Sequence, residues 1–501
     1  MKLPRSYYNW TSFIGTLIVV IALLLIVVLF IISTIFDQGS SYLGLFIYMA
    51  LPALMIVGLI LIPVGMLVNL RNNATDDDYK KRRKPTIDLN DKRHQNAFVI
   101  FIISSLIFLF LTSIGSYEAF HYTESVAFCG TLCHKVMDPE YVTYQHSAHA
   151  NVACVECHVG TGASWYVKSK VSGLYQVYAA LFDKYPRPIE TPVQDLRPAR
   201  ETCEKCHWPE KFYARKLRVQ KNFLADENNT EWDIVMQMKT GPLYSALGLK
   251  EGSHWHINKD VKIEYISSDR SRESIPWVRF TNLKTGEVTV YQDEENLLED
   301  SLLAVLPVRT MDCIDCHNRP SHAYKSPPDY IDNALISGTI PKDIPQIKYI
   351  AMDALKDPFT NKDTAFMYID SVVTNFYQRD YADYYTENQD KIARAIAGIQ
   401  EAFSLNTFPA MKVSYAAYPD HIGHLETNGC FRCHSNLHTS EDGNAISKDC
   451  DLCHTIVAQG IPGEMMTASI FDTLEFQHPV PLRNDVWKVV FCSECHKNLF
   501  Q

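Results

Sequence analysis

The stretch Cys154-Val-Glu-Cys157-His158 places two cysteines three positions apart and follows the second one directly with histidine. The same Cys-x-x-Cys-His pattern recurs five more times along the chain, ending at His207, His317, His434, His454 and His496. A longer version, Cys129-Gly-Thr-Leu-Cys133-His134, precedes them and has three residues between its cysteines. The seven motifs together contain all 14 cysteines of the 501-residue chain, so the fold must be built around them.

Cys-x-x-Cys-His is the attachment motif of c-type haem, in which both thiols bond to the porphyrin and the adjacent imidazole ligates iron. Zinc sites or a disulfide framework would leave the seven adjacent histidines unexplained. For the longer motif, a local disulfide with His134 as a bystander is the alternative. We therefore predict seven covalently bound haem c groups. The predicted attachment residues are Cys129, Cys133, Cys154, Cys157, Cys203, Cys206, Cys313, Cys316, Cys430, Cys433, Cys450, Cys453, Cys492 and Cys495, and the predicted iron ligands are His134, His158, His207, His317, His434, His454 and His496.

Three uncharged, apolar segments, 11–36, 41–70 and 96–116, stand at the start of the chain. Each is long enough to cross about 30 Å of hydrocarbon as a helix, which takes roughly 20 residues. A cleaved signal peptide is the alternative for the first segment, but its length and the lack of a small-x-small cleavage site favour a retained anchor. We therefore predict three transmembrane helices.

The charges between these segments predict their orientation. The loop 71–95 holds the basic run Lys80-Lys-Arg-Arg-Lys84, whereas the turn 37–40 has no basic residue. The positive-inside rule then puts the amino terminus and this loop in the cytoplasm, and everything after Tyr117 outside. Covalent haem attachment belongs to an exported, oxidising compartment, which agrees with this orientation. We expect a multi-pass protein of the cytoplasmic (inner) membrane with a periplasmic haem domain.

The net charge is divided in the same way. Residues 1–95 carry ten basic and six acidic side chains, a net of +4, whereas residues 96–501 carry a net of −14. An acidic exported part argues against nucleic acid as a partner and permits electrostatic steering of a basic partner protein.

The spacing of the motifs predicts the domain organisation. We expect a membrane anchor over 1–116, a three-haem domain over 117–220, a β-rich insert over 221–312, one haem site with a helical spacer over 313–428, and a three-haem cluster over 429–501. The insert is predicted from alternating apolar residues at 261–266, 277–280 and 288–291. The fold class is therefore three transmembrane helices plus an exported multihaem c-type domain, mostly α, with much irregular structure around the haems and a small β insert.

The sixth iron ligand decides between an electron carrier and an enzyme, because an open iron position binds and transforms a small molecule. Beyond the motifs, the exported histidines fall into six clusters, which matches six haems. Which of His254 and His256, or of His421 and His424, ligates is left open, and a structural role is the alternative at each position. Met137 follows His134 by three residues and is a candidate for the first haem, with a core methionine as the alternative. The candidate distal ligands are Met137, His149, His254, His256, His322, His421, His424, His438 and His478.

The run Cys129-x-x-x-Cys133-His134-x-x-Met137, then Tyr141-x-x-Tyr144-x-x-Ser147-x-His149 and Cys154-x-x-Cys157-His158-Val159, resembles the NapC/NirT/NrfH family. This is a family of membrane-anchored periplasmic multihaem quinol dehydrogenases, and the resemblance covers roughly residues 117–215. By layout and motif count, the whole chain is also similar to the ImcH-type inner-membrane cytochromes of metal-respiring bacteria.

The resemblance implies that menaquinol is oxidised near the first haem, with Met137 close to its iron and His149 as a distal ligand. About 12 residues separate the third apolar segment from Cys129, so this haem is expected close to the lipid surface. Segment 165–178 is amphipathic and aromatic, which suits a position at the membrane interface.

The resemblance also implies residues for a quinol pocket. Lys170, with Lys168 nearby, matches the family's lysine, and Gln176 stands where the family has an acid. Because an amide cannot take a proton, Asp138, Glu140 or water remain as proton acceptors. Plain anchoring to lipid headgroups is the alternative role for the two lysines.

The expected function is electron transfer from the menaquinol pool to periplasmic c-type cytochromes or a respiratory reductase complex. Three alternatives remain open at this point. One is a reductase of a small oxyanion such as nitrite, another is a quinone reductase running in reverse, and the third is a haem-bearing subunit of a larger respiratory complex.

Overall fold

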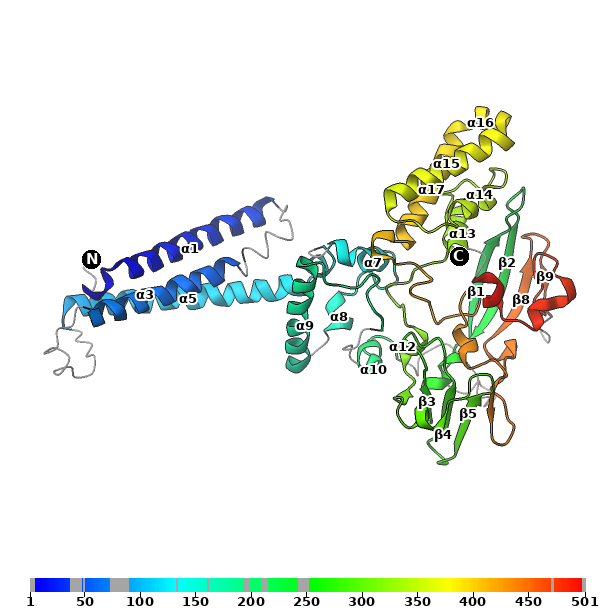
Figure 1. Ribbon diagram of the computed structural model, residues 1–501, viewed down its shortest axis with the longest axis horizontal. Helices are drawn as coiled ribbons and strands as arrows, with labels where there is room; N and C mark the ends of the chain where they lie inside the picture. Colours follow the sequence, from blue (N-terminus) through cyan, green and yellow to red (C-terminus); the bar gives the residue numbers. More distant parts are fainter. Residues whose placement is uncertain are drawn as a thin grey trace. The chain divides into compact units, whose positions relative to one another are not determined.

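The computed structural model describes residues 5–36, 47, 50–72, 90–131, 134–159, 162–192, 198–208, 215–241, 252–469 and 473–497. The chain forms two compact units, whose elements are labelled in Figure 1. The first unit comprises Met1–His134 together with Ala153–Val155. The second comprises Lys135–Val152 and Glu156–Gln501.

Three long apolar helices make up most of the first unit: α1 (Trp10–Phe36), α3 (Leu51–Asn72) and α5 (Lys92–Glu124). The short helix η1 (Arg5–Tyr7) precedes them and α6 (Val126–Thr131) follows them. All three are long and apolar enough to cross a membrane, which confirms the three predicted spans by length and composition. The helix α5 extends beyond the predicted span 96–116 at both ends, and most of 41–49 lies outside the described residues.

Helices α1 and α3 run side by side and pack closely (Figure 1). Their backbones meet at two glycines: a Cβ on Gly15 would lie 2.7 Å from the Gly58 carbonyl oxygen, and one on Gly58 would lie 2.9 Å from that of Gly15. The Ser12 hydroxyl donates a hydrogen bond to the Ile62 carbonyl at 2.9 Å. Small residues thus allow the close backbone contact that drives helix association in lipid.

After α6, the described cysteine motifs occupy single helical turns separated by irregular chain, and all but the first residues of α7 and α8 belong to the second unit. The helices and turns of this part are α7 (His134–Gln145), α8 (Cys154–His158), α9 (Ala163–Leu181), α10 (Ala199–Cys203), η4 (Ser253–Ile257), α11 (Asp300–Leu303), α12 (Cys313–Cys316), η6 (Gly429–Arg432), η7 (Cys450–Leu452), η8 (Arg483–Lys488) and α18 (Cys492–His496).

Two antiparallel sheets lie in the second unit. The first has the order β1-β2-β8-β9 and the second the order β6-β3-β4-β5-β7. The predicted alternating segments become the three central strands of the second sheet, but its partner strands and the whole first sheet were not predicted. Both sheets join strands from 215–312 to strands from 438–467. The strands are β1 (Arg215–Phe223), β2 (Glu231–Lys239), β3 (Val261–Ile266), β4 (Trp277–Asn282), β5 (Val288–Asp293), β6 (Arg309–Thr310), β7 (His438–Ser440), β8 (His454–Gly460) and β9 (Met466–Thr467).

The predicted helical spacer is a well-packed helical module (Figure 1). Its first helix starts with a Ser326 cap followed by Pro327 and ends at Gly338, which adopts the left-handed conformation that favours glycine. Apolar residues of four helices form one buried core that includes Ile331, Ile369 and Ile399. The four helices are α13 (Pro327–Ser337), α14 (Ile347–Ala354), α15 (Lys362–Asp380) and α17 (Gln389–Asn406). The short helix α16 (Ala382–Glu387) lies between the last two in sequence, and η5 (Pro409–Met411) follows them.

Candidate functional site

Each described motif folds into one helical turn, and the motif at Cys313 shows why. Asp312 caps the turn by accepting a hydrogen bond from the Cys313 backbone N–H, and the Asp315 carboxylate accepts one from the Asp312 backbone N–H at 2.7 Å. The His317 backbone N–H then donates to the Cys313 carbonyl at 2.8 Å. Because residues three apart on a turn are neighbours, both thiols face the same side, next to the histidine.

Six motif histidines each face a histidine from elsewhere in the chain. The ring centres of these pairs lie 5.9–6.4 Å apart. All twelve rings belong to the second unit, and no ring is shared between pairs. The pairs are His207 with His149, His158 with His322, His317 with His254, His434 with His256, His454 with His424, and His496 with His478.

This separation fits one iron between two axial imidazoles. A metal–imidazole bond is about 2 Å long and the ring centre lies about 1 Å behind the nitrogen, so two such rings have centres roughly 6 Å apart. Among the described residues, no three His, Cys, Asp or Glu side chains gather around one point as a protein-only metal site requires. Facing pairs next to two cysteines match haem, in which the porphyrin supplies the other four ligands.

Backbone carbonyls orient five of the six histidine rings that face the motif histidines. The Nδ1 atoms of His149 and His322 donate hydrogen bonds to the carbonyls of Pro320 and Glu140 at 3.1 and 3.0 Å. His254 and His256 do the same toward Thr240 and Ser253 at 2.5 and 2.7 Å. The Nδ1 atom of His478 lies 2.7 Å from the Val480 carbonyl oxygen and 3.3 Å from the Val480 backbone nitrogen. A carbonyl only accepts, so Nδ1 carries the hydrogen and Nε2 keeps the lone pair that a metal needs.

The sixth distal ring, that of His424, is oriented by stacking instead. Its ring lies 4.4 Å from that of Phe431, with an angle of 22° between the planes. Phe431 belongs to the fifth motif, Cys430-Phe-Arg-Cys433-His434. An aromatic ring inside one motif thus positions the distal histidine that faces another motif.

Burial favours the neutral, metal-binding form of most of these imidazoles, because it penalises the charged form. Burial lowers the pKa of His322 and of His424 to about 4. It also lowers the pKa of His158, His256, His317, His434, His454 and His496.

Two candidate ligands have other roles in the structure. His421 is 3% exposed, donates from Nδ1 to the Asp315 carbonyl at 3.1 Å, and holds Nε2 2.8 Å from a Glu273 carboxylate oxygen. His438 is 1% exposed, and its two ring nitrogens bond with the Ile275 carbonyl at 2.7 Å and the Ser435 hydroxyl at 3.3 Å. Neither ring belongs to the six facing pairs, and each is held by hydrogen bonds to other parts of the protein, so the proposed ligand set does not include these two histidines.

Motifs that follow one another in sequence are also neighbours in space. In the first unit, the hydrogen bond with Cys129 lowers the pKa of the Cys154 thiol to about 7. In the second unit, the hydrogen bond between Cys203 and Cys313 lowers the pKa of the first thiol and raises that of the second. Glu156 of the second motif pairs with Lys205 of the third at 3.8 Å.

The later motifs continue this order. Burial, and then the nearby Cys430 thiol, raise the pKa of Cys316 and that of Cys453 to about 11 each. Burial raises the pKa of Cys492, with Cys450 among the lesser causes. The fourth to seventh motifs are therefore linked pairwise in the order of the sequence.

The first motif is described only in part. Cys129 lies in α6, whereas Cys133 and the side chain of His134 lie outside the described residues. Met137 and the exposed Asp138 follow in α7, one turn along from its first residue. The structure therefore leaves the ligands of a haem at this motif as predictions.

The predicted interfacial segment is the helix α9. Seven apolar side chains form an exposed stripe along it and at its carboxy-terminal cap: Val167, Val171, Leu174, Tyr175, Tyr178, Leu181 and Phe182. At about 100° per residue, Lys168 and Lys170 flank this stripe on opposite sides, whereas Gln176 lies on the far face. The ammonium groups of the two lysines lie over the rings of Trp165 and Tyr166, at 5.2 and 4.9 Å. The candidate quinol-site residues of α9 thus share no single face.

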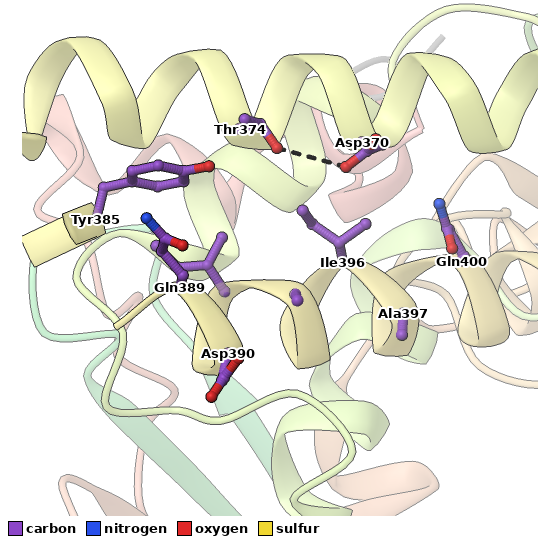
Figure 2. A pocket seen from close by; sticks show the side chains of 10 residues that line it. Asp370, Thr374, Tyr385, Gln389, Asp390, Ile396, Ala397 and Gln400 are labelled. Carbon is purple, nitrogen blue, oxygen red and sulfur yellow. Dashed lines mark hydrogen bonds between the residues drawn. The ribbon is translucent and has the colours of Figure 1, made fainter. Parts of the chain in front are cut away.

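A cleft of about 570 Å³ lies between α15 and α17 of the helical module (Figure 2). Its walls carry Asp370, Thr374, Tyr385 and Gln389 among others, and no histidine or cysteine. Figure 2 shows Thr374 turned toward Asp370, to which its hydroxyl donates at 3.4 Å. This cleft contains none of the candidate site residues.

Long apolar helices followed by repeated Cys-x-x-Cys-His turns with facing imidazoles define a membrane-anchored multihaem c-type cytochrome. The model of the NapC/NirT cytochrome c family, N-terminal region, matches residues 91–192. The cytochrome c-type protein NrfH of Wolinella succinogenes is 32% identical over 115 residues, which cover 22% of this chain and 63% of that protein.

The cytochrome c-type protein ImcH of Geobacter sulfurreducens is 40% identical over 495 residues, which cover 99% of this chain and 96% of that protein. The chain therefore belongs to the ImcH family of NapC/NirT-type membrane cytochromes, and the predicted resemblance is confirmed. Membership implies covalently bound haem c and a role in electron transfer. No solved structure matches the chain.

Proposed function

We propose that this cytochrome transfers electrons from menaquinol through seven haem c groups to a periplasmic electron carrier. Each bound haem iron supplies a centre that takes up and releases one electron. The oxidation of one menaquinol gives two electrons and two protons, so the protein must also offer a proton acceptor at the quinol end.

The observation that carries this proposal is the pairing of six motif histidines with six other histidines. We propose these twelve as the axial ligands of six haems. An iron held by two imidazoles keeps no open position, so it is suited to electron transfer and not to the reduction of nitrite or hydroxylamine. With this ligand set, only the first haem could have an open iron position at which a small oxyanion is reduced.

The proposed location is the cytoplasmic membrane, with the amino terminus and the loop 71–95 in the cytoplasm and the second unit in the periplasm. The basic run Lys80–Lys84 supports this orientation through the positive-inside rule. The seven attachment motifs support it independently, because thiols bond to haem in an exported compartment.

We place quinol oxidation at the first haem, where His134 and Met137 are the proposed ligands. The helix α9 supports a site at the membrane surface, because its exposed apolar stripe with flanking lysines suits a helix lying in the interface. Lys168 and Lys170 lie at the edges of that stripe, within reach of both headgroups and a quinol ring. Gln176 lies on the opposite face, so a direct contact with quinol is assigned to the lysines first.

The proton acceptor is proposed from the short helix α7. Asp138 is exposed there, whereas burial raises the pKa of Glu140. A carboxylate that accepts a proton more readily than usual suits this task, so Glu140 is the stronger candidate of the two.

The exit is proposed at the carboxy-terminal motifs, because the contacts between motifs follow the sequence order. Residues 96–501 carry a net charge of −14, which suits a basic, soluble c-type cytochrome as acceptor. A haem-bearing subunit of a larger respiratory complex remains the second candidate, and a partner that co-purifies with the chain would favour it.

The test is anaerobic reduction of the detergent-purified protein by a menaquinol analogue, followed at the haem α-band. We expect rapid reduction of several haems that a quinol-site inhibitor blocks, and slower reduction in Lys170→Gln. Lys184→Gln, which changes an exposed lysine just beyond α9, is the matched control and should leave the rate unchanged. No reduction, in protein that dithionite still reduces, would overturn the proposal.

A further inference from the structure

The tripeptide His254-Trp255-His256 contributes a ring to two different imidazole pairs. His254 faces His317 of the fourth motif with ring centres 6.1 Å apart and planes inclined by 11°. His256 faces His434 of the fifth motif at 5.9 Å, with planes inclined by 86°. Both histidines lie in η4, where residues two positions apart point about 120° away from each other. One short turn therefore reaches two motifs at once.

The backbone of this turn is fixed on both sides. Gly252 precedes it with φ of +104°, and a Cβ there would collide with the backbone of Gly241, so only glycine fits. At the other end, the Arg200 guanidinium donates to the Ile257 carbonyl at 2.8 Å. The two rings themselves donate through Nδ1 to the carbonyls of Thr240 and Ser253.

The middle residue anchors the turn to the second sheet. The Trp255 ring stacks on Phe280 of β4, with centres 5.6 Å apart and planes inclined by 23°. It packs against a core that contains Ile263, Tyr265 and Val278. Displacement of this ring would move His254 and His256 together, because they are its direct neighbours in the chain.

The two facing motifs are tied to each other as well. The Arg432 guanidinium, within the fifth motif, donates to the Asp315 carbonyl of the fourth at 2.8 Å and to the Arg272 carbonyl at 2.6 Å. These hydrogen bonds hold the fourth and fifth motifs together, and the tripeptide faces the histidines of both motifs.

We propose that His254-Trp255-His256 is a double distal ligand that joins the fourth and fifth haems, with Trp255 as the residue that positions both rings. This inference rests on the haem ligation in the proposed function and goes beyond it, because it assigns two irons to one turn. Because the motifs are neighbours in sequence order, the tripeptide would connect the first four motifs with the last three. Its rigidity holds the two centres at one separation during electron transfer.

The ring angles give the two haems different spectroscopic signatures. Nearly parallel axial imidazoles produce a rhombic low-spin ferric signal in electron paramagnetic resonance, whereas perpendicular ones produce a strongly anisotropic low-spin signal. The His254–His317 haem should be of the first kind and the His256–His434 haem of the second. The two irons can therefore be told apart by the kind of signal that each single variant removes, without reference to turnover.

The test compares His254→Ala, His256→Ala and the double variant in the full-length, haem-loaded protein. Each single variant should convert one haem per chain to high spin, with loss of a rhombic signal in the first case and of an anisotropic signal in the second. The double variant should convert two. His438→Ala is the control, because His438 is a histidine that bonds with Ile275 of the same core and belongs to no facing pair, and it should convert none.

Trp255→Phe adds a test of positioning. It should shift the midpoint potentials of two haems and leave the others unchanged, whereas a purely local packing role would shift none. If either alanine variant loses haem altogether, the matching His→Met variant replaces it and should show the near-infrared band of His/Met ligation on one haem. The inference is overturned if only one of the two histidines produces a ligand change, or if both variants alter the same signal.

These outcomes separate the inference from the proposed function. Spin-state changes are measured in resting protein, so they do not depend on menaquinol. If menaquinol does not reduce the protein but the two single variants still remove the rhombic and the anisotropic signal, the proposed function is wrong and the double-ligand inference is supported.

Discussion

Replacement of Asp315 by alanine is expected to destabilise the second unit strongly, because this carboxylate lies inside the fourth motif at 2% exposure. One of its oxygens accepts hydrogen bonds from the Tyr265 hydroxyl at 2.7 Å, from Arg272 at 2.8 Å and from Arg309 at 2.7 Å. The other accepts from the Asp312 backbone at 2.7 Å. Although burial opposes the charge on Arg309, the hydrogen bond and charge of Asp315 hold its pKa above its usual value.

Removal of the carboxylate leaves two guanidinium groups without their counter-charge. Breaking a buried ion pair in this way costs about 3–5 kcal/mol. Tyr265→Phe removes one hydrogen bond to the same charge and should cost about 1.5–3 kcal/mol. For urea unfolding with a slope of ~3 kcal/mol per molar, Asp315→Ala should lower the midpoint by about 1–1.7 M.

The assay is urea unfolding of the haem-loaded protein, followed by circular dichroism. The control is Asp353→Ala, which removes an exposed carboxylate 3.5 Å from Lys356 and should change the free energy by under ~0.5 kcal/mol. An Asp315→Ala midpoint within 0.2 M of the control, taken as roughly the resolution of such curves, would refute the reasoning.

Three further outcomes are expected. Burial raises the pKa of Asp332 to about 6 from 3.8, so its contribution to folding is full below pH ~4 and lost as the pH rises through 6. The unfolding free energy of the wild type, measured relative to that of Asp332→Asn, should therefore fall by about 3 kcal/mol over this pH window. A difference between the two proteins that does not change with pH would contradict this. His322→Ala should yield one high-spin haem per chain by magnetic circular dichroism, whereas His421→Ala should yield none; the reverse pattern would exchange their roles. Gly58→Val should weaken the α1–α3 contact, since its Cβ would meet the Gly15 carbonyl, and a lower thermal midpoint in detergent is the check.

The sequence predicted those features that depend on local pattern. The three apolar segments predicted α1, α3 and α5, since length and composition suffice for a membrane span. Alternation predicted the strands β3, β4 and β5, and the helical spacer predicted within 313–428 contains the helices α15 and α17. Haem attachment at the individual cysteine motifs stays a prediction, which rests on a chemistry that requires contiguous residues.

Features that depend on distant pairing were not predicted. The first sheet needs β8, which begins at a motif histidine, to pair with β2, more than two hundred positions earlier. The pairing of imidazoles was likewise hidden, because His322 is five residues from His317 yet faces His158 instead. The spacing of His254 and His256 was a usable signal: two histidines flanking one residue in a short turn point to different sides.

The candidate quinol residues show most clearly that the sequence alone does not place side chains on one face of a helix. Lys168, Lys170 and Gln176 came from a family resemblance and a linear segment, and only the helix α9 shows that they lie on different faces. The buried partners of Asp315 also left no sequence signal, because Tyr265, Arg272 and Arg309 reach it from three separate segments.

The central claim is that six of the irons are closed by two histidines each and serve only to carry electrons. The most direct measurement is a count of haem per chain together with the spin state of each iron, from pyridine haemochrome analysis and low-temperature magnetic circular dichroism of the oxidised protein. The account predicts seven haems per chain, with six low-spin bis-histidine irons and at most one of another kind. Two or more high-spin haems in the intact protein would contradict it and reopen the case for a small-molecule reductase.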